Sequence, residues 1–238
     1  MRVVVILPTY DERENLEALT REVLALEIGA DVLVVDDNSP DGTGALADAL
    51  AAHEPRVRVI HRAGPRGLGA ASIEGLREAL ARRADAAVVM DADFSHPPRV
   101  IPALLAALDR CDVAVASRYA SGGGAVGRPL ARRVMSRCLN LYARLALGLP
   151  VHDTTGSFRA YRMEKMMPVL DRVRSPGYAY LEEILFRCRE AGLRLAEVPY
   201  TFEPRRAGAS KISWREAAGA LSTITRLGFS RCCRRKEG

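Results

Sequence analysis

The 238-residue sequence has no apolar run of about 18 residues, so we expect no membrane-spanning helix. It has only five cysteines, an odd number with no C-x-x-C spacing, which argues against a secreted disulfide framework and a structural zinc site. The apolar run that follows Met1 is too short for a signal peptide, and no cleavage site comes after it. These absences together predict a cytoplasmic protein.

Aromatic residues make up only 5% of the chain, and no stripe of basic residues with interleaved aromatics occurs, so a nucleic-acid-binding function is disfavoured. Lysine is also scarce, since Lys165, Lys211 and Lys236 are the only three, and arginine supplies nearly all the positive charge behind the net +6. This charge suits anionic partners such as phosphates or a membrane surface. GC-rich codon usage would produce the same bias, and composition does not separate the two explanations.

Strand-like and helix-like segments alternate over the first half of the chain. Short apolar runs predict strands at residues 3–7, 31–35, 57–60, 86–90 and 112–116. Helices are expected at 43–53, 68–83 and 98–109, and also after Asp11, which forms a capping-box pattern with Glu14. This alternation predicts an α/β fold, with a mostly parallel, Rossmann-like sheet flanked by helices on both faces.

The second half of the chain is less regular. Residues 120–127 are rich in glycine and predict a mobile loop, whereas residues 153–159 predict a polar turn. Helices are expected at residues 131–147, 178–191 and 213–229, with one or two short strands at 195–202 and a basic loop at 203–211.

Acidic residues follow two of the predicted strands: Asp36-Asp37 ends the second, and Asp91-Ala92-Asp93 ends the fourth. Ligands of parallel sheets bind beyond the carboxyl ends of the strands, where Pro8-Thr9-Tyr10 is also expected. In an extended chain, Asp91 and Asp93 point the same way, roughly 7 Å apart. Such a pair can hold Mg²⁺ or Mn²⁺ together with substrate phosphates, and Ser95 could add a hydroxyl from the same side.

Two common nucleotide-binding patterns are absent. Residues 64–69 are glycine-rich but lack the G-x-x-x-x-G-K-[ST] pattern, and no G-x-G-x-x-G follows the first strand. We therefore exclude a P-loop and a nicotinamide dinucleotide site. The adjacent acids Asp36 and Asp37 instead suit hydrogen bonds to a ribose or to a base edge.

Three segments, residues 7–15, 35–43 and 90–97, resemble the inverting glycosyltransferases of family 2, and most closely those that transfer mannose to dolichyl or polyprenyl phosphates. The resemblance covers residues 3–215, and its motifs occur in order. Further matches are Ser117-Arg118-Tyr119, Arg132-Arg133, Ser136-Arg137, Asn140, residues 153–159, Arg205, Gly208, Ser210 and Lys211.

This resemblance implies a GT-A nucleotide-sugar transferase fold and a set of site residues. The nucleoside would contact Pro8, Tyr10, Glu12, Val35 and Asp37. The diphosphate and metal would lie at Asp91, Ala92 and Asp93, with Ser95 where some members have a glutamine ligand. Arg118, Arg205 and Lys211 match contacts to phosphates, and Arg132 lies in the expected acceptor loop. Asp91, Asp93, Arg118 and Arg132 are thus the expected catalytic residues.

The implied reaction is the inverting, metal-dependent transfer of mannose from GDP-mannose to a dolichyl or polyprenyl phosphate. The chemistry suits these residues, because a metal and arginines can neutralise the departing diphosphate. A phosphate acceptor is already anionic and needs no strong base, and arginine binds it well.

Other functions stay open at this point. A related transferase could use UDP-glucose or another UDP-sugar, or could act on a sugar hydroxyl with Glu183 as the base. Pairing of Glu183 with Arg187 one helical turn later is the favoured alternative for that residue. A non-catalytic nucleotide-sugar-binding subunit is less favoured, because the acidic pair and the basic loop are both present.

We expect a catalytic domain at residues 1–212, followed at 213–238 by an amphipathic helix and a basic tail with Cys232 and Cys233. This end of the chain could bind a bilayer surface, although a plain terminal helix with a frayed tail would explain the same pattern. A lipid acceptor would then require peripheral binding at the cytoplasmic face of a membrane, or a separate membrane-anchoring or downstream transferase partner.

Overall fold

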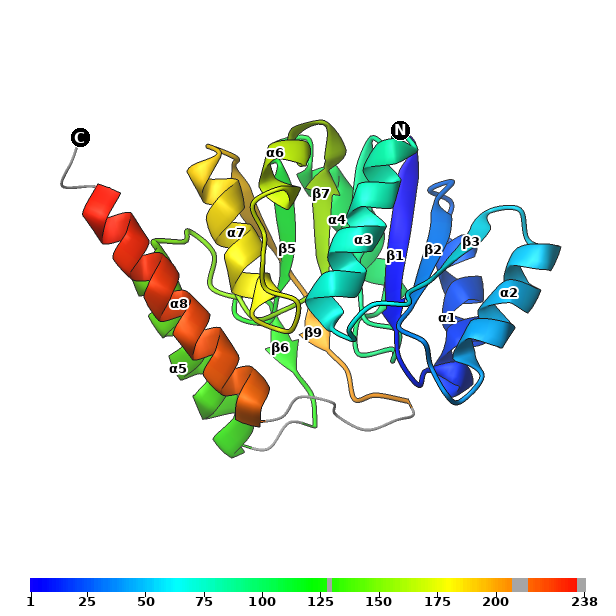
Figure 1. Ribbon diagram of the computed structural model, residues 1–238, viewed down its shortest axis with the longest axis horizontal. Helices are drawn as coiled ribbons and strands as arrows, with labels where there is room; N and C mark the ends of the chain where they lie inside the picture. Colours follow the sequence, from blue (N-terminus) through cyan, green and yellow to red (C-terminus); the bar gives the residue numbers. More distant parts are fainter. Residues whose placement is uncertain (128–129, 207–213, 235–238) are drawn as a thin grey trace.

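A computed structural model describes residues 1–127, 130–206 and 214–234, and within them the fold is built on a seven-stranded sheet (Figure 1). The strands are β1 (Val3–Thr9), β2 (Asp31–Asp36), β3 (Val57–His61), β4 (Ala86–Val89), β5 (Val113–Ser117), β7 (Arg159–Arg162) and β8 (Leu195–Pro199). Their order is β3-β2-β1-β4-β7-β5-β8, and every neighbouring pair is parallel except those that include β7. The predicted α/β fold with a mostly parallel sheet is therefore confirmed.

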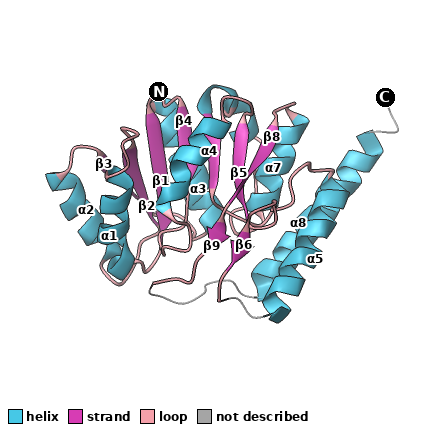
Figure 2. Ribbon diagram, turned by 180° about the vertical axis from the view of Figure 1, so that it is seen from behind, coloured by secondary structure: helices cyan, strands magenta, loops and turns pink. Residues whose placement is uncertain are grey.

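Helices cover both faces of the sheet. Figure 1 shows α3 (Leu68–Ala81), α6 (Met167–Leu170) and α7 (Tyr180–Glu190) over one face. Figure 2, seen from behind, shows α1 (Arg13–Leu24), α2 (Thr43–His53) and α4 (Ile101–Ala107) over the other. Alternate residues of β1 enter the two cores, Val4 and Ile6 on the α3 side and Val5 and Leu7 on the α1 side. Burial on both faces explains why these strands are continuous apolar runs.

The strand register brings the carboxyl ends of three strands to one edge of the sheet. Thr9 of β1 pairs with Asp36 of β2, and Ile6 of β1 pairs with Val89 of β4. The polar residues that follow these strands therefore emerge side by side.

One expectation about the second half of the chain is wrong, and one strand was not predicted. Residues 153–158 form a turn without regular secondary structure, as expected, but Arg159 begins β7, which inserts antiparallel between β4 and β5. The glycine-rich stretch 120–127 contains β6 (Gly124–Ala125), which pairs with β9 (Thr201–Phe202) in a small second sheet. The pairing with a distant strand orders a segment whose composition predicted a mobile loop.

The predicted capping box is also wrong. Helix α1 begins at Arg13, and the side chain of its N-cap residue, Glu12, makes no capping hydrogen bond. The Arg13 N–H instead donates to the Asp41 carboxylate (3.2 Å). Asp11 has a left-handed backbone with φ +53°, and its N–H donates to the Ser39 hydroxyl (3.1 Å). Asp11 thus turns the chain away from β1 instead of capping the helix.

Helices α5 (Leu130–Leu147) and α8 (Trp214–Arg234) lie side by side at one end of the sheet (Figures 1 and 2). The Tyr142 and Thr225 hydroxyls join them at 2.8 Å. The inner face of α5 is buried at Asn140, Ala143 and Leu147. Its outer face carries an exposed apolar stripe, which we call the outer stripe of α5, at Leu130, Val134, Leu141 and Leu145. In the described part of the chain, no helix is both long enough and apolar enough to cross a membrane.

We predict opposite effects for alanine at two helical glycines. A Cβ on Gly75 of α3 would lie 2.5 Å from Ile6 Cγ2, whereas one on Gly219 of α8 would meet no described atom within 4 Å. Gly75→Ala should lower the free energy of unfolding by about 1–3 kcal/mol, because overpacking outweighs the roughly 1 kcal/mol gained in helix propensity. Gly219→Ala should raise it by up to about 1 kcal/mol. Urea unfolding measures both, and a stabilised Gly75→Ala variant would contradict the close packing of α3 on β1.

Candidate active site

A cavity of about 370 Å³ opens at the carboxyl edge of the sheet. Eight residues predicted from the sequence line it: Pro8, Tyr10, Glu12, Asp37, Asp91, Ala92, Asp93 and Arg205. The other described lining residues are Thr9, Arg66, Gly67, Leu68, Ala71, Tyr178 and Glu216. The cavity thus gathers groups from the ends of three parallel strands and from segments more than a hundred residues away.

The acidic end of the cavity is formed by the turn after β4. Asp93 is almost fully buried, and its carboxylate accepts the Ser95 N–H (3.0 Å) and forms an ion pair with Arg205 Nε (2.9 Å). Asp91 is more exposed and accepts a hydrogen bond from the Ser157 hydroxyl (2.7 Å). Arg205 therefore brings a positive charge to the carboxylate pair from a segment far along the chain.

The oxygens at this end fit a hard divalent cation. No cluster of three or more His, Cys, Asp or Glu side chains suited to a metal occurs in the described part of the chain. A cation here would be held by Asp91 and Asp93 and completed by phosphate oxygens and water, which is the usual way in which Mg²⁺ binds with substrate phosphates. The Ser95 hydroxyl is buried and has no hydrogen-bond partner among the described residues, but it does not line the cavity.

His96 supports the acidic turn and was not predicted as a site residue. The Asp91 N–H donates to its Nδ1 (3.0 Å), and its ring stacks on Phe158 with centroids 5.0 Å apart. Burial lowers the pKa of His96, although the carboxylates of Asp91 and Asp93 act in the opposite direction. The neutral ring therefore carries its proton on Nε2 and holds the Asp91 backbone in place.

The other end of the cavity is formed by Tyr10 and the loop before α3. The Arg66 guanidinium contacts the Tyr10 hydroxyl and lies over the Tyr10 ring, 4.6 Å from its centroid. Asp37 secures this loop, because its carboxylate pairs with Arg62 and accepts the Gly67 N–H (2.7 Å). The glycine-rich pattern of residues 64–69 did not predict a site at this loop, so Arg62 and Arg66 were missed.

Helix α8 also reaches the cavity, through Glu216 in its first turn. The Glu216 carboxylate accepts the Tyr178 N–H (3.1 Å), so it ties the segment before α7 to α8. Burial, and after it the nearby Asp91 carboxylate, raise the pKa of the Tyr178 phenol, which stays protonated. The domain boundary expected near residue 212 lies outside the described residues and remains a prediction.

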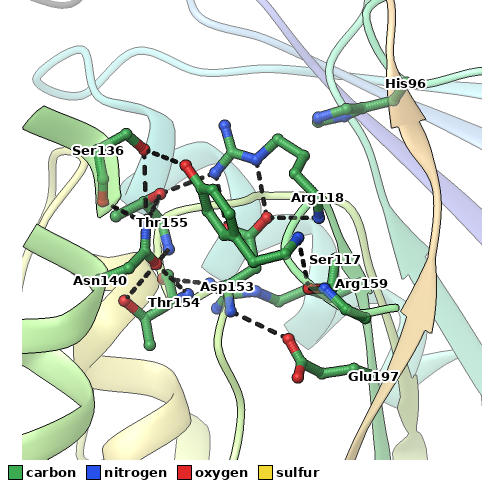
Figure 3. A network of polar contacts seen from close by, with 12 residues as sticks. His96, Ser117, Arg118, Ser136, Asn140, Asp153, Thr154, Thr155, Arg159 and Glu197 are labelled. Carbon is green, nitrogen blue, oxygen red and sulfur yellow. Dashed lines mark hydrogen bonds and ion pairs between the residues drawn. The ribbon is translucent and has the colours of Figure 1, made fainter. Parts of the chain in front are cut away.

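Arg118 lies outside the cavity lining, in a buried network beside it (Figure 3). Its Nε and Nη2 donate to the two carboxylate oxygens of Asp153 at 2.7 and 2.6 Å, and Nη2 also donates to Thr155 Oγ1 (2.8 Å). Burial alone would raise the pKa of Asp153, but the charge and hydrogen bonds of Arg118 hold it below its ordinary value. The pair therefore stays ionised, and the role of Arg118 toward phosphate remains a prediction.

Four other predicted residues lie apart from the cavity or outside the described chain. Val35 is buried in the core beneath α3, and Ser95 is buried behind Asp93. Arg132 is exposed on α5, and Lys211 lies outside the described residues. Glu183, the candidate base, accepts the N–H groups of Arg174 and Ser175 and lies 3.3 Å from Arg187 Nη2, so the favoured pairing is confirmed.

The sequence model described as Glycosyl transferase family 2 matches residues 4–169. The chain belongs to glycosyltransferase family 2. It is 42% identical over 231 residues to the undecaprenyl-phosphate mannosyltransferase of Micrococcus luteus. The alignment covers 97% of this chain and 95% of that protein. It is also 42% identical to the polyprenol monophosphomannose synthase of Mycolicibacterium smegmatis, over 96% of this chain and 87% of that protein. The dolichol-phosphate mannosyltransferase of Pyrococcus furiosus is 39% identical, over 95% and 64%.

Solved structures place this glycosyltransferase among GT-A folds. The glucosyl-3-phosphoglycerate synthase of Mycobacterium tuberculosis, crystallised with Mn²⁺, UDP and glucosyl-3-phosphoglycerate, superposes with a TM-score of 0.69. The match covers 97% of this chain and 80% of that chain at 21% sequence identity. This likeness confirms the expected GT-A fold.

We predict a pH-dependent gain in stability when Glu182 of this glycosyltransferase is neutralised. Burial raises the pKa of Glu182 on α7 to about 8 from an ordinary value of 4.5. Between these values the folded state keeps a proton that the unfolded chain has lost, so folding stability falls as the pH rises through this window. Glu182→Gln should therefore gain stability relative to the wild type from pH 5 to pH 8 in urea unfolding. Exposed Glu164→Gln is the control, and an equal Glu182→Gln effect at both pH values would contradict the prediction.

Proposed function

We propose that the protein transfers mannose from GDP-mannose to a dolichyl or polyprenyl phosphate, with inversion at the anomeric carbon. The observation that carries the proposal is the 42% identity, over 97% of this chain, to an undecaprenyl-phosphate mannosyltransferase. A cavity with acidic, aromatic and basic groups at the carboxyl edge of the sheet supports it.

In this proposal the donor lies along the cavity. Tyr10, Glu12 and Asp37 bind the nucleoside, and the diphosphate lies against Asp91, Ala92 and Asp93. A Mg²⁺ or Mn²⁺ ion held by Asp91 and Asp93 would neutralise the charge that develops on the departing diphosphate. Arg205, now paired with Asp93, brings a further positive charge to the same place.

The acceptor side needs an anion site more than a base. A polyprenyl phosphate is already ionised near neutral pH, so its oxygen can attack without transferring a proton to the protein. The Glu183 carboxylate pairs with Arg187 and accepts two backbone N–H groups. This arrangement is consistent with a reaction that does not use Glu183 as a base. We assign the acceptor phosphate to Arg118 beside the cavity, to Arg132 on α5, and to Lys211, which lies outside the described residues.

We further propose that α5 and α8 rest on the cytoplasmic face of a membrane, where the lipid acceptor resides. The outer stripe of α5 exposes four large apolar side chains, and α8 exposes Leu221 and Phe229. Arg133, Arg137 and Arg144 on α5 add positive charge that suits anionic lipid headgroups. A separate membrane-anchoring or downstream partner is compatible with this arrangement.

The reaction is tested by incubating the protein with a short-chain polyprenyl phosphate and GDP-mannose, UDP-glucose or UDP-N-acetylglucosamine, each with Mg²⁺, Mn²⁺ or EDTA. Of the three donors, we expect only GDP-mannose to give a glycosylated lipid, a mannolipid. We expect no product when EDTA replaces the metal. Asp93→Asn should lower transfer on the order of 100-fold or more, because it removes charge from the metal and diphosphate site.

The control is Asp109→Asn, which changes an exposed acid in the turn after α4 and should leave transfer unchanged. Transfer from a UDP-sugar would contradict the proposed donor, GDP-mannose, without contradicting the fold. Full activity of Asp93→Asn, with the same response to metal, would show that the metal site is wrongly assigned.

The membrane surface is tested with Leu141→Asp/Leu145→Asp, which places two charges in the outer stripe of α5. This variant should co-sediment several-fold less with anionic phospholipid vesicles than the wild type, because charge does not enter the acyl boundary. Met167→Asp, at an exposed apolar residue of α6, is the matched control. GDP affinity checks folding, and equal vesicle binding by all three proteins would refute the proposed surface.

A further inference from the structure

Asn140 connects helix α5 to the segment 153–157, which borders the active site (Figure 3). Its side chain is buried on the inner face of α5. The carboxamide oxygen accepts three hydrogen bonds, from the Thr154 N–H (2.5 Å), the Thr154 hydroxyl (3.0 Å) and the Thr155 N–H (3.2 Å). A single side-chain oxygen thus satisfies two backbone donors, one of them buried, in a segment that has no regular secondary structure.

The amide nitrogen of Asn140 is also engaged. It donates to the Ser136 carbonyl one turn earlier in α5 (2.7 Å) and to the Thr155 hydroxyl oxygen (3.1 Å). Hydrogen-bond acceptors therefore surround the amide nitrogen and donors surround the amide oxygen, and this pattern defines the orientation of the carboxamide. Asparagine alone among side chains of this size offers both functions, so aspartate would keep the three bonds at the oxygen and lose the two at the nitrogen.

The segment that Asn140 holds leads to two charged groups beside the cavity. The Thr155 hydroxyl oxygen also accepts from Arg118 Nη2 (2.8 Å), and Asp153 binds the rest of that guanidinium. Two residues further on, the Ser157 hydroxyl donates to Asp91 (2.7 Å). A continuous chain of hydrogen bonds and backbone therefore runs from α5 to Arg118 and to Asp91.

The opposite face of α5 is the outer stripe of apolar residues, so one helix carries both features. A second tie joins its inner face to the end of β5, where the Tyr119 hydroxyl donates to Ser136 Oγ (2.8 Å). Helix α5 therefore contacts both segments that flank Arg118. Asn140 binds Thr154 and Thr155, and Ser136 binds Tyr119, the residue after Arg118.

We propose that Asn140 is a positioning residue, which holds segment 153–157 and Arg118 at a fixed place relative to α5 so that the acceptor phosphate meets the donor correctly. The inference rests on the proposed function, because it assigns the acceptor to the α5 side. Asn140 does not line the cavity, so its substitution should leave nucleotide binding intact. Errors of about 1 Å in the placement of reacting groups can lower a rate on the order of 100-fold.

The test compares Asn140→Ala and Asn140→Asp with Leu147→Ala, which removes a buried apolar side chain from the same face of α5. Calorimetry with GDP and Mn²⁺ gives the affinity and the fraction of sites that are folded. Steady-state transfer from GDP-mannose to a polyprenyl phosphate in vesicles gives kcat and KM per folded site. Hydrogen exchange reports the backbone amides of Thr154 and Thr155.

For Asn140→Ala we expect GDP affinity within about twofold of the wild type, kcat/KM for the acceptor lowered about tenfold or more, and faster exchange at Thr154 and Thr155. Asn140→Asp should show a smaller loss, because it keeps the bonds at the oxygen, and it serves if the alanine variant fails to fold. Leu147→Ala should lose stability but keep kcat/KM per folded site within about twofold.

A merely structural role predicts a different pattern, in which the number of GDP sites and the maximal rate per total protein fall together, while kcat per folded site and KM stay constant. That result for both Asn140 variants would overturn the proposal. If the wild type makes no mannolipid, the proposed function fails separately. The kinetic comparison then uses the acceptor that the wild type does accept, and unchanged exchange at Thr154 and Thr155 would still refute the positioning role.

Discussion

The site depends on the burial of the Asp93 carboxylate at the end of a parallel strand. An ionised carboxyl group that is almost fully removed from water must be paired, because the loss of its hydration would otherwise be very costly. Here the Ser95 N–H and Arg205 provide that pairing, and the Arg206 N–H also donates to the Asp93 carbonyl (3.3 Å). The pairing of one buried charge thus brings a segment more than a hundred residues away into the lining of the cavity.

The same principle extends outward from the cavity. Asp37 orders the loop before α3 through Arg62 and Gly67, and Asp153 holds Arg118 beside the cavity. Each of these buried carboxylates accepts a backbone N–H as well as pairing with an arginine, so specific contacts hold the loops at the polar edge of the sheet. Such contacts would favour the proposed placement of two phosphate-bearing substrates, since catalysis by charge stabilisation requires groups that are already in position.

Much of the fold could be predicted because its strands are buried on both faces and therefore appear as continuous apolar runs. Strand β7 could not, since it contains Arg159, whose burial depends on carbonyls of Thr154 and Leu181 that no local pattern reveals. The acidic ends of β2 and β4 pointed to the cavity because parallel topology brings strand ends together. Arg66, His96 and Glu216 were missed because their places depend on contacts between distant segments.

The central claim is that a nucleoside diphosphate and a divalent cation share the cavity at the carboxyl edge of the sheet. The most direct measurement is a crystal structure with GDP and Mn²⁺, using anomalous scattering to locate the metal. We predict an anomalous peak between Asp91, Asp93 and the diphosphate, with the nucleoside against Tyr10 and Asp37. Manganese bound elsewhere, or a nucleotide outside this cavity, would contradict it.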